Sequence, residues 1–470
     1  MDEKTKSAAE ELKEKLIAEQ KNGGLVLSDA EIEQAFAFSE GYKSFLDSAK
    51  TEREAVDTAI GILRAKGFQQ FETGKRYNAG DKVYYNNRGK ALILATIGTK
   101  PVGQGVRIAA AHIDSPRLDL KPRPLYEDAQ LALFKTHYYG GIKKYQWTAI
   151  PLALHGVVIK ADGTKAEITI GEDEGDPVFC VTDLLPHLAD EQSKRTLGQG
   201  IKGEELNILI GCMPFKDDKA SEAVKLNIMN LLNQKYGIVE ADFLSAELEA
   251  VPAYRAKDLG FDRGMVAAYG HDDRVCAYTA LMAATHCESP LYTTVTVLAD
   301  KEETGSEGNT GLDSSYLRYF IADLAEPYGV NARIVLSASK CLSADVNAAF
   351  DPTFPDVLDR RNCAYLNNGV VVTKYTGSRG KSGTSDCSAE FFGEVRSLLD
   401  THKVLWQIGE LGKVDLGGGG TVAKYIAGLN VDVLDVGVPV LSMHAPMEVV
   451  SKLDVYSAYR AFYEFFNINQ

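Results

Sequence analysis

The spacing of apolar residues changes near residue 82 of the chain. Residues 1–66 combine charged stretches with apolar residues at helical spacing, ending in DTAIGILRAKGF, and this pattern predicts helices. From about residue 82 the apolar residues alternate, as in KVYYNNRGKALILATIG, and the turn Asn86-Asn87-Arg88-Gly89 predicts a hairpin. The next apolar run, GVRIAAAHIDSP, predicts a further strand. The N-terminal part is therefore expected to be helical first and strand-forming afterwards.

Residues 116–264 have a different pattern. Short strand-like runs such as PLALHGVVIK and KAEITIG alternate there with acidic turns. Two stretches inside this part, 181–195 and 221–237, carry helical patterns. We expect a mostly β insertion in this part of the chain.

After residue 265, helical and strand-like stretches alternate. Helices are predicted over 271–287, 314–329, 387–403 and 453–466, and strands over 292–300, 332–340, 369–377 and 439–446. Alternation of this kind is typical of an α/β fold. We therefore predict a mixed-sheet α/β sandwich formed by residues 1–115 and 265–470, into which residues 116–264 are inserted as a β-rich domain.

Composition and charge limit the classes of function. The chain has 470 residues and a formal net charge of −14, from 65 acidic and 51 basic residues, which argues against a nucleic-acid-binding surface. No apolar run approaches the length of a membrane span, and the charged N-terminal segment lacks the apolar core of a signal peptide. Seven cysteines without a CxxC pair are typical of a reducing compartment. We expect a cytoplasmic protein that binds neither nucleic acid nor membrane.

Side chains able to bind metal follow several of the predicted strands. In an α/β sheet, sites form at the carboxyl ends of strands, so such side chains from distant segments are expected to converge. Imidazole and carboxylate groups together are typical ligands of divalent metals such as zinc. The sequence therefore predicts a site for two divalent metals. Asp273 can also cap the helix predicted over 271–287. The candidate residues are His112, Asp272, Asp273, Glu302, Glu303, Asp345 and His444.

The adjacent pair Glu302-Glu303 suggests a division of roles. A metal pair needs carboxylate ligands, and hydrolysis needs a further carboxylate that takes a proton from the attacking water. Two neighbouring glutamates that point in different directions meet both needs. Asp114 follows His112 by two positions on a predicted strand, so both side chains are expected on one side of it, with Asp114 orienting the imidazole.

Five segments resemble, in order, the motifs of the aspartyl aminopeptidase family of dizinc metallopeptidases. They are HIDSPRLDLKP, DDRVCAYTAL, DKEETGS, SADVNAAFDP and SMHAPMEVVSKLD, which run from residue 112 to about residue 455. The resemblance thus covers most of the chain, and the ordered set is far more specific than any single motif in it.

The resemblance implies a role for each candidate. One metal would be bound by His112, Asp272 and Asp345, and the other by Asp272, Glu303 and His444, so that Asp272 bridges the pair. Glu302 would be the general base for attack by a water that bridges the metals, and Asp114 would support His112.

The resemblance also implies how the chain assembles and which residues meet the substrate. Family members have a β-rich dimerisation domain where this chain has residues 116–264. They form tetrahedral dodecamers, in which a histidine from a neighbouring subunit completes the site. The segment LLPHLADEQ is similar to the one that carries this histidine, which nominates His187. The residues expected to contact substrate are Lys374, Gly419, Gly420 and Thr421.

The implied activity is the release of N-terminal residues from peptides. Acidic residues are the favoured substrates, because Lys374 would pair with an acidic side chain. Ala348 stands where strictly acidic-selective relatives often have histidine, so a neutral residue such as leucine stays open. The metals are expected to be zinc, with cobalt or manganese as alternatives. Two other functions stay open: a dimetal deacylase or carboxypeptidase-like hydrolase, and a non-catalytic shell or scaffold protein.

Overall fold

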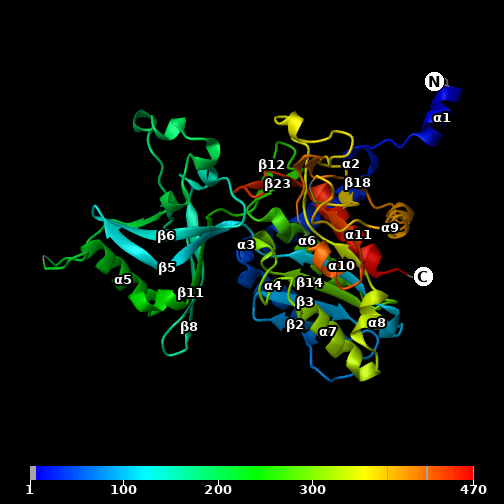
Figure 1. The fold of residues 1–470 in the computed structure, drawn as a ribbon, viewed down its shortest axis with the longest axis horizontal. Coiled ribbons are helices and arrows are strands. Elements are labelled where there is room, and N and C mark those ends of the chain that lie inside the picture. Colours follow the sequence, from blue (N-terminus) through cyan, green and yellow to red (C-terminus); the bar gives the residue numbers. More distant parts are fainter. Residues whose placement is uncertain (1–6, 218, 378, 420–421, 469–470) are drawn as a thin grey trace.

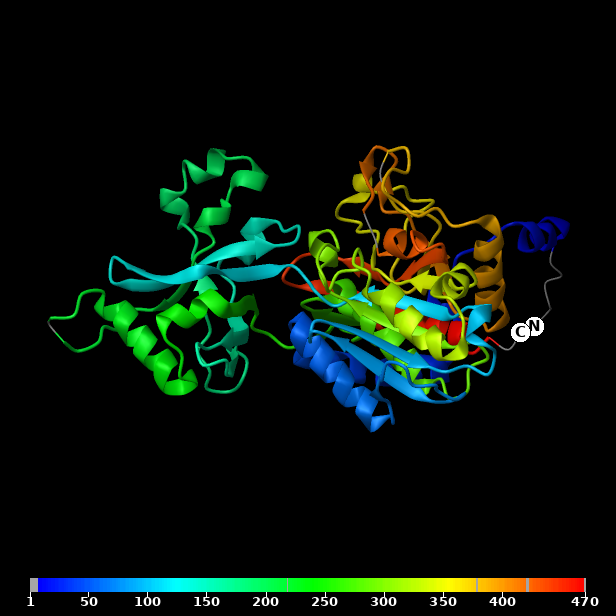
Figure 2. The same cartoon turned by 60° about the horizontal axis from the view of Figure 1, so that its bottom comes forward.

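The chain folds into two lobes that lie side by side (Figures 1 and 2). The computed structural model describes residues 7–217, 219–377, 379–419 and 422–468. The first lobe holds the N-terminal helices and the C-terminal half of the chain, and the second holds residues from about 117 to 252. Both lobes mix strands and helices, so the predicted mixed α/β class is confirmed.

A mixed sheet forms the centre of the first lobe. Its strands, in sheet order, are β1 (Gln69–Gln70), β2 (Lys82–Asn87), β3 (Ala91–Thr96), β14 (Thr294–Ala299), β4 (Arg107–His112), β15 (Lys340–Ser343), β21 (Asp432–Gly437), β17 (Val370–Thr373) and β18 (Trp406–Ile408). The predicted hairpin is confirmed, because β2 and β3 pair in antiparallel register. The adjacent strands β14, β4, β15 and β21 are parallel, so their carboxyl ends share one edge of the sheet.

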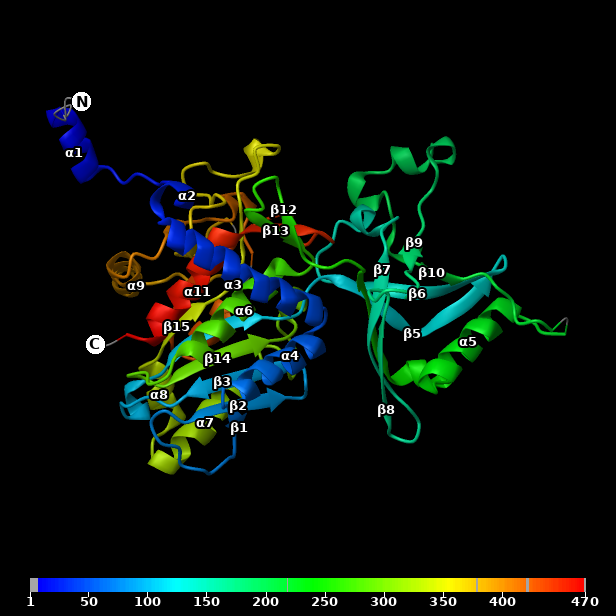
Figure 3. The same ribbon diagram turned by 180° about the vertical axis from the view of Figure 1, so that it is seen from behind.

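Helices cover both faces of this sheet, and alternate strand residues explain why. Leu92 and Leu94 of β3 pack into the same apolar cluster as α3, α4, α6, α9 and α11, whereas Ile93 and Ala95 pack with α7, α8 and α10. Figure 3 shows α3 and α4 on one face, and Figure 1 shows α7 and α8 on the other. The helices are α1 (Ala8–Leu16), α2 (Gly23–Val26), α3 (Asp29–Ser48), α4 (Glu52–Ala65), α5 (Ala223–Tyr236), α6 (His271–His286), α7 (Tyr316–Ala325), α8 (Ala332–Ser337), α9 (Ala389–Thr401), α10 (Ala423–Ala427) and α11 (Lys452–Phe466).

The second lobe is built on its own sheet and its own apolar core. The strands, in sheet order, are β8 (Lys165–Ile170), β7 (Leu152–Ile159), β11 (Ala246–Pro252), β5 (Arg117–Asp128), β6 (Leu131–Tyr139), β10 (Ile208–Gly211) and β9 (Cys180–Val181). Phe134, Trp147 and Phe243 lie in the buried cluster of this lobe. The strand-rich character of this part agrees with the alternating pattern of its sequence.

A smaller sheet lies beside the carboxyl edge of the large one. Its strands are β12 (Lys257–Leu259), β13 (Met265–Ala268), β23 (Glu448–Ser451), β22 (Pro439–Leu441) and β16 (Asn347–Ala348), and a separate two-stranded ribbon contains β19 (Gly412–Lys413) and β20 (Leu416–Gly417). The turn between β22 and β23 carries His444. This sheet therefore brings a C-terminal segment to the edge where β4 ends.

The helix predicted over 181–195 is wrong. The structure has only two short 3₁₀ turns there, at Pro186–Leu188 and Gln192–Lys194. Pro186 lacks a backbone N–H and disfavours helical backbone at Leu185, which is extended. The second predicted helix of this part is confirmed as α5.

The strand predicted over 332–340 is wrong for most of its length. Ala332–Ser337 form helix α8, and only the last residue of the predicted range, Lys340, belongs to strand β15. The side chain of Asn331 caps α8 by accepting a hydrogen bond from the N–H of Arg333. A short apolar run such as ARIVLS fits either structure, and the cap decides between them.

No helix of the described residues is long and apolar enough to cross a membrane. All seven cysteines are free thiols, and five of them are buried, which agrees with the unpaired cysteines that the sequence predicts.

Candidate active site

The site lies where three neighbouring parallel strands end. His112 is the last residue of β4 and stands opposite Ala299, the last residue of β14. Glu302 begins a 3₁₀ turn three residues after β14, and Asp345 follows β15 by two residues. Sites of α/β sheets form at this edge, because the segments that leave parallel strands meet there. The predicted convergence of distant segments is therefore seen in the structure.

Asp272 lies between the two histidines. Its Oδ1 atom is 3.1 Å from Nε2 of His112, and its Oδ2 atom is 3.1 Å from Nε2 of His444. Asp272 lies in the first turn of α6, where its own backbone is not helical, and α6 packs beside β4. Each carboxylate oxygen thus faces a different imidazole, which is the arrangement that a carboxylate bridging two metals requires.

The remaining candidates surround this pair. Nε2 of His444 is 3.4 Å from Oε1 of Glu303. Nε2 of His112 is 3.8 Å from Oδ1 of Asp345 and 3.9 Å from Oε2 of Glu302. All predicted ligands and the predicted base therefore lie in one cluster.

Both histidines are oriented through Nδ1. The Nδ1 atom of His112 is 3.0 Å from the backbone oxygen of Asp114 and 3.3 Å from its Oδ1 atom. The Nδ1 atom of His444 is 2.8 Å from the backbone oxygen of Gly141. A carbonyl oxygen only accepts, so Nδ1 carries the proton in both rings. Nε2 is then free to bind a metal.

Two buried carboxylates hold the backbone of the ligand segments. Asp114 accepts the N–H groups of Glu302 and Glu303, each at 3.2 Å. Glu448 accepts the N–H of Asp272 at 3.0 Å and the N–H of His444 at 2.6 Å. The sequence did not single out Glu448, although it stands in the last motif, four residues after His444.

The charges of the cluster do not balance among the protein groups alone. Burial and repulsion by Asp345 and Asp272 raise the pKa of Glu302 to about 8. Burial and Asp272 raise the pKa of Glu303 well above its ordinary value, and its Oε1 atom is buried without a hydrogen bond from the described residues. Although burial opposes it, the surrounding carboxylates raise the pKa of His112 far above its usual value. Buried carboxylates that outnumber their positive partners fit a bound divalent cation.

Two groups of donor atoms are close enough to bind one ion each. The first contains His112, Asp273 and Asp345, and the second contains His112, Asp272 and Glu303, with donor atoms within 4.8 Å of one another. The sequence predicts Asp272 rather than Asp273 beside Asp345. Asp273 does not cap α6 as predicted, because both of its carboxylate oxygens are buried without a hydrogen-bond partner among the described residues. Burial and Asp345 raise the pKa of Asp273 well above its ordinary value.

The other predicted residues lie outside this cluster. His187 is exposed on a 3₁₀ turn of the second lobe. Lys374 is exposed and follows β17, which runs antiparallel to β21, so its carboxyl end points away from the edge that carries His112. The loops after Lys374 and before α10 touch, because the N–H of Gly377 donates to the oxygen of Gly419. Gly420 and Thr421 lie outside the described residues.

Known proteins resemble the chain over nearly its whole length. Residues 45–466 match the model of a family described as aminopeptidase I zinc metalloprotease, M18. A probable M18 family aminopeptidase 1 of Clostridium acetobutylicum is 49% identical over 460 residues, which cover 96% of this chain and 99% of the relative. These matches favour an aminopeptidase over the deacylase and scaffold alternatives.

Solved structures have the same fold. The crystal structure of an M18 family aminopeptidase from Thermotoga maritima is 44% identical, has a TM-score of 0.92, and matches over 96% of this chain and 99% of its own. A structure described as the mApe1 dodecamer of Saccharomyces cerevisiae has a TM-score of 0.74 at 19% identity, over 91% of this chain and 96% of its own, and shares the fold. The chain therefore belongs to the M18 family of zinc aminopeptidases and is a metallo-aminopeptidase, a peptide hydrolase.

Proposed function

We propose that the enzyme releases N-terminal residues from peptides with two zinc ions bound in this cluster. The proposed ligands are His112, Asp272 and Asp345 for one ion and Asp272, Glu303 and His444 for the other. The observation that carries the proposal is the position of Asp272, whose two oxygens each lie 3.1 Å from Nε2 of a different histidine. When bound, zinc polarises a carbonyl and lowers the pKa of a coordinated water.

Glu302 is the proposed general base. Its Oε2 atom faces the cluster at 3.9 Å from His112, yet Glu302 belongs to neither group of donor atoms close enough to bind one ion. Asp114 holds its backbone N–H, so the carboxylate is aimed from a fixed turn. Glu302 takes a proton from the attacking water and later passes one to the leaving amine.

The variant Glu302→Gln tests this role. We expect it to retain zinc, as measured by metal analysis of the purified protein, and to lose at least a hundredfold in kcat, because the amide cannot accept the proton. Glu307→Gln is the matched control, since Glu307 is exposed in the same loop. Near-normal turnover of Glu302→Gln would remove this residue as the base.

Acidic N-terminal residues are the proposed preferred substrates, with Lys374 as the cation that recognises them and Asp114 as support for His112. Gly419, Gly420 and Thr421 are proposed to face the bound peptide. Hydrolysis of Asp-, Glu-, Leu- and Lys-aminoacyl substrates, with chelator and metal add-back, tests the preference. Lys374→Met should reduce turnover of the acidic substrates alone. Equal rates on Asp and Leu substrates in the wild type would replace this proposal with a neutral preference.

The proposed assembly is a tetrahedral dodecamer of cytoplasmic subunits. In it, residues 1–115 and 265–470 form the catalytic α/β sandwich, and residues 116–264 form the dimerisation domain. Exposed leucines support a contact surface on the second lobe, at Leu184, Leu185, Leu188 and Leu197. The yeast protein of the same fold is described as a dodecamer. His187, which lies among these leucines on the second lobe, is proposed to reach the site of a neighbouring subunit.

Analytical ultracentrifugation and enzyme kinetics test the assembly. We expect a particle of twelve chains, and we expect His187→Ala to lower kcat without changing the sedimentation coefficient. His137→Ala, at another exposed histidine of the same lobe, is the control. A monomer with full activity would exclude both the assembly and the role of His187.

A further inference from the structure

A short segment of the second lobe reaches the metal-binding cluster of the first. Strand β6 ends at Tyr139, and Gly140 and Gly141 follow it. These three residues, called here the 139–141 segment, contact Asp114, His444 and the surroundings of Glu303. The segment belongs to the lobe that contributes none of the clustered ligands described above.

Tyr139 completes the hydrogen bonds of Asp114. Its hydroxyl donates to Oδ2 of Asp114 at 2.7 Å. The same carboxylate accepts the N–H groups of Glu302 and Glu303 and lies 3.3 Å from Nδ1 of His112. Asp114 is fully buried, so its orientation is fixed by these donors rather than by water. The hydroxyl therefore acts on His112 through Asp114.

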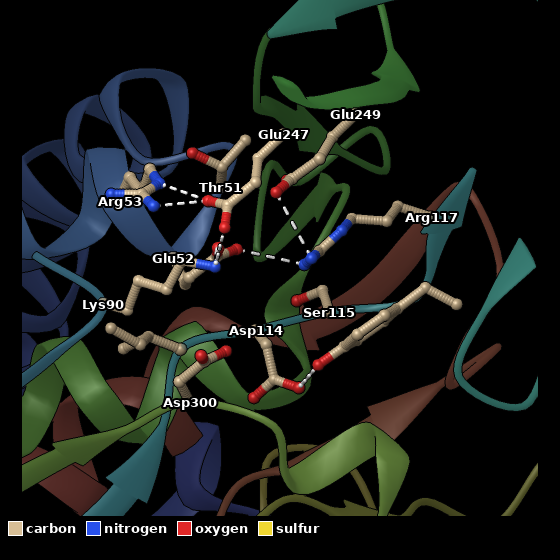
Figure 4. Close-up of polar contacts among 12 residues, drawn as sticks. Thr51, Glu52, Arg53, Lys90, Asp114, Ser115, Arg117, Glu247, Glu249 and Asp300 are labelled. Atoms are coloured by element: carbon tan, nitrogen blue, oxygen red, sulfur yellow. Dashed lines mark hydrogen bonds and ion pairs between the residues drawn. The ribbon is translucent and has the colours of Figure 1, made fainter. Parts of the chain in front are cut away.

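A buried arginine holds the ring of Tyr139 in place. The guanidinium of Arg117 lies 4.0 Å from the ring centroid. Arg117 also bonds Glu52 of α4 at 3.1 Å and Glu249 of β11 at 3.2 Å, as the dashed lines in Figure 4 show. Glu52 belongs to the first lobe and Glu249 to the second. The ring position is thus set by both lobes together.

The two glycines complete the contact. The backbone oxygen of Gly141 accepts a hydrogen bond from Nδ1 of His444 at 2.8 Å. Gly140 has a φ of 74°, and a Cβ atom there would lie 3.3 Å from Oε2 of Glu303. Glycine at this position allows both the left-handed backbone and the close approach to a proposed ligand.

We propose that the 139–141 segment is a positioning element through which the second lobe orients both metal-binding histidines. Tyr139 sets His112 through Asp114, and Gly141 sets His444 directly. The inference rests on the proposed metal site and adds the segment that orients its two histidines. The segment touches ligands and their supports, so its members are positioning residues.

The variant Tyr139→Phe tests whether Tyr139 orients His112 through Asp114. It keeps the ring on Arg117 and removes the hydroxyl. We expect zinc affinity, measured by competition with a chromogenic chelator, to fall 10- to 100-fold, because partners of metal-ligating histidines have effects of this size. We expect kcat to fall with KM unchanged.

Tyr138→Phe is the matched control for this variant. Tyr138 is the preceding residue of β6 and is partly exposed, and its substitution should leave zinc affinity and kcat unchanged. Equal zinc affinity of Tyr139→Phe and wild type would overturn the role of the hydroxyl.

The variant Gly140→Ala tests the close approach to Glu303. Gly163→Ala is its control, because Gly163 has a φ of 82° and open space where a Cβ would lie. Both substitutions introduce the same backbone strain. Only Gly140→Ala should weaken zinc binding, by tenfold or more in the same competition assay. Equal zinc affinities of Gly140→Ala and Gly163→Ala would overturn the proposed role of Gly140.

The wild-type titration separates this inference from the proposed function. If the wild-type protein binds no zinc, the proposed metal site is wrong, because no substitution then accounts for the missing zinc. If wild-type protein binds two zinc ions and all four variants bind them equally well, the metal site stands and the positioning role of the segment fails.

Discussion

Glu448 holds the backbone of two proposed metal ligands. Its buried carboxylate accepts the N–H of Asp272 at 3.0 Å and the N–H of His444 at 2.6 Å. These two residues come from α6 and from the turn before β23, which are far apart in the sequence. A carboxylate that joins them fixes the distance between the two segments. We therefore expect it to affect metal binding at the proposed site through these two backbone segments.

Replacing Glu448 with glutamine should weaken metal binding. The amide keeps one acceptor oxygen but turns an NH₂ group toward the second N–H, so one ligand segment loses its partner. We expect zinc affinity to fall 10- to 100-fold in chelator competition. Glu390→Gln, on an exposed position of α9, should leave the affinity unchanged. An unaltered affinity in Glu448→Gln would mean that the backbone holds the ligands without this carboxylate.

Some of these roles could be predicted from the residue type, and others could not. His112, Glu302 and Asp345 could be selected because their side chains bind metals or protons and they follow apolar runs. The partner of His444 is the backbone oxygen of Gly141, and any residue carries such an oxygen. Nothing in the sequence pattern marks that contact, so it required the fold.

At the scale of elements, Asp258 of β12 joins two helices. Its carboxylate lies 2.6 Å from Nζ of Lys43 in α3 and 2.8 Å from Nζ of Lys452 in α11, and Arg263 also bonds it. Although burial opposes ionisation, the hydrogen bonds from Lys43, Lys452 and Arg263 lower the pKa of Asp258 below its usual value. The ionised carboxylate therefore stabilises the packing of α3 and α11 around the small sheet.

Asp258→Asn should remove the stabilisation by this carboxylate, and the loss of stability should depend on pH. Because the folded-state pKa is lowered, the stabilisation is present above the unfolded-state pKa of about 3.9 and is lost as the pH falls below it. At pH 7 we expect the free energy of unfolding in urea to drop by about 1 to 3 kcal/mol. The difference from wild type should narrow at pH 3. A difference that stays constant with pH would point to lost packing rather than lost charge.

Elements with a clear period were predictable, and short ones were not. The helices α9 and α11 and the hairpin of β2 and β3 follow from the spacing of their apolar residues. Helix α8 has six residues, too few to show a period, and its cap at Asn331 was the stronger signal. Strand β21 was not predicted, because its sequence DVLDVG does not alternate regularly between polar and apolar residues.

At the scale of the whole molecule, a network of charged residues with a buried centre at Arg117, Glu52 and Glu249 joins the lobes (Figure 4). Arg117 of the second lobe bonds Glu52 of the first, and Lys90 lies 2.9 Å from Glu247 across the same junction. Although burial opposes it, Arg117 and Lys90 lower the pKa of Glu52 below its usual value. These contacts depend on how two separate sheets meet, and no local sequence pattern contains that information.

Arg117→Ala should destabilise the junction strongly. It leaves Glu52 and Glu249 buried without their main positive partner, and loss of one partner of a buried ion pair costs about 3 to 5 kcal/mol. Urea unfolding at fixed protein and zinc concentrations measures this difference. Arg123→Ala, at an exposed position of the same strand, should change it by less than about 0.5 kcal/mol. Similar effects of the two variants would show that the junction does not depend on this network.

Removing metal should destabilise the whole molecule. Without a cation, the carboxylates of the cluster repel one another at neutral pH, and a bound metal stabilises the folded state by about 4 kcal/mol at a thousand times its Kd. We expect a chelator to lower the thermal unfolding midpoint and added zinc to restore it. Magnesium should not restore it, because imidazole ligands suit it poorly. Unchanged midpoints after verified metal removal would contradict a metal bound in this cluster.

The spread of the site along the chain also has a consequence for synthesis. Its residues begin at His112, and the carboxylate that fixes the last ligand is Glu448, close to the C-terminal helix. A ribosome delivers the chain from its N-terminus, so earlier segments fold before later ones exist. The proposed metal site cannot be complete until the segment that carries Glu448 has been made. A nascent chain that ends before this segment is therefore expected to lack the activity.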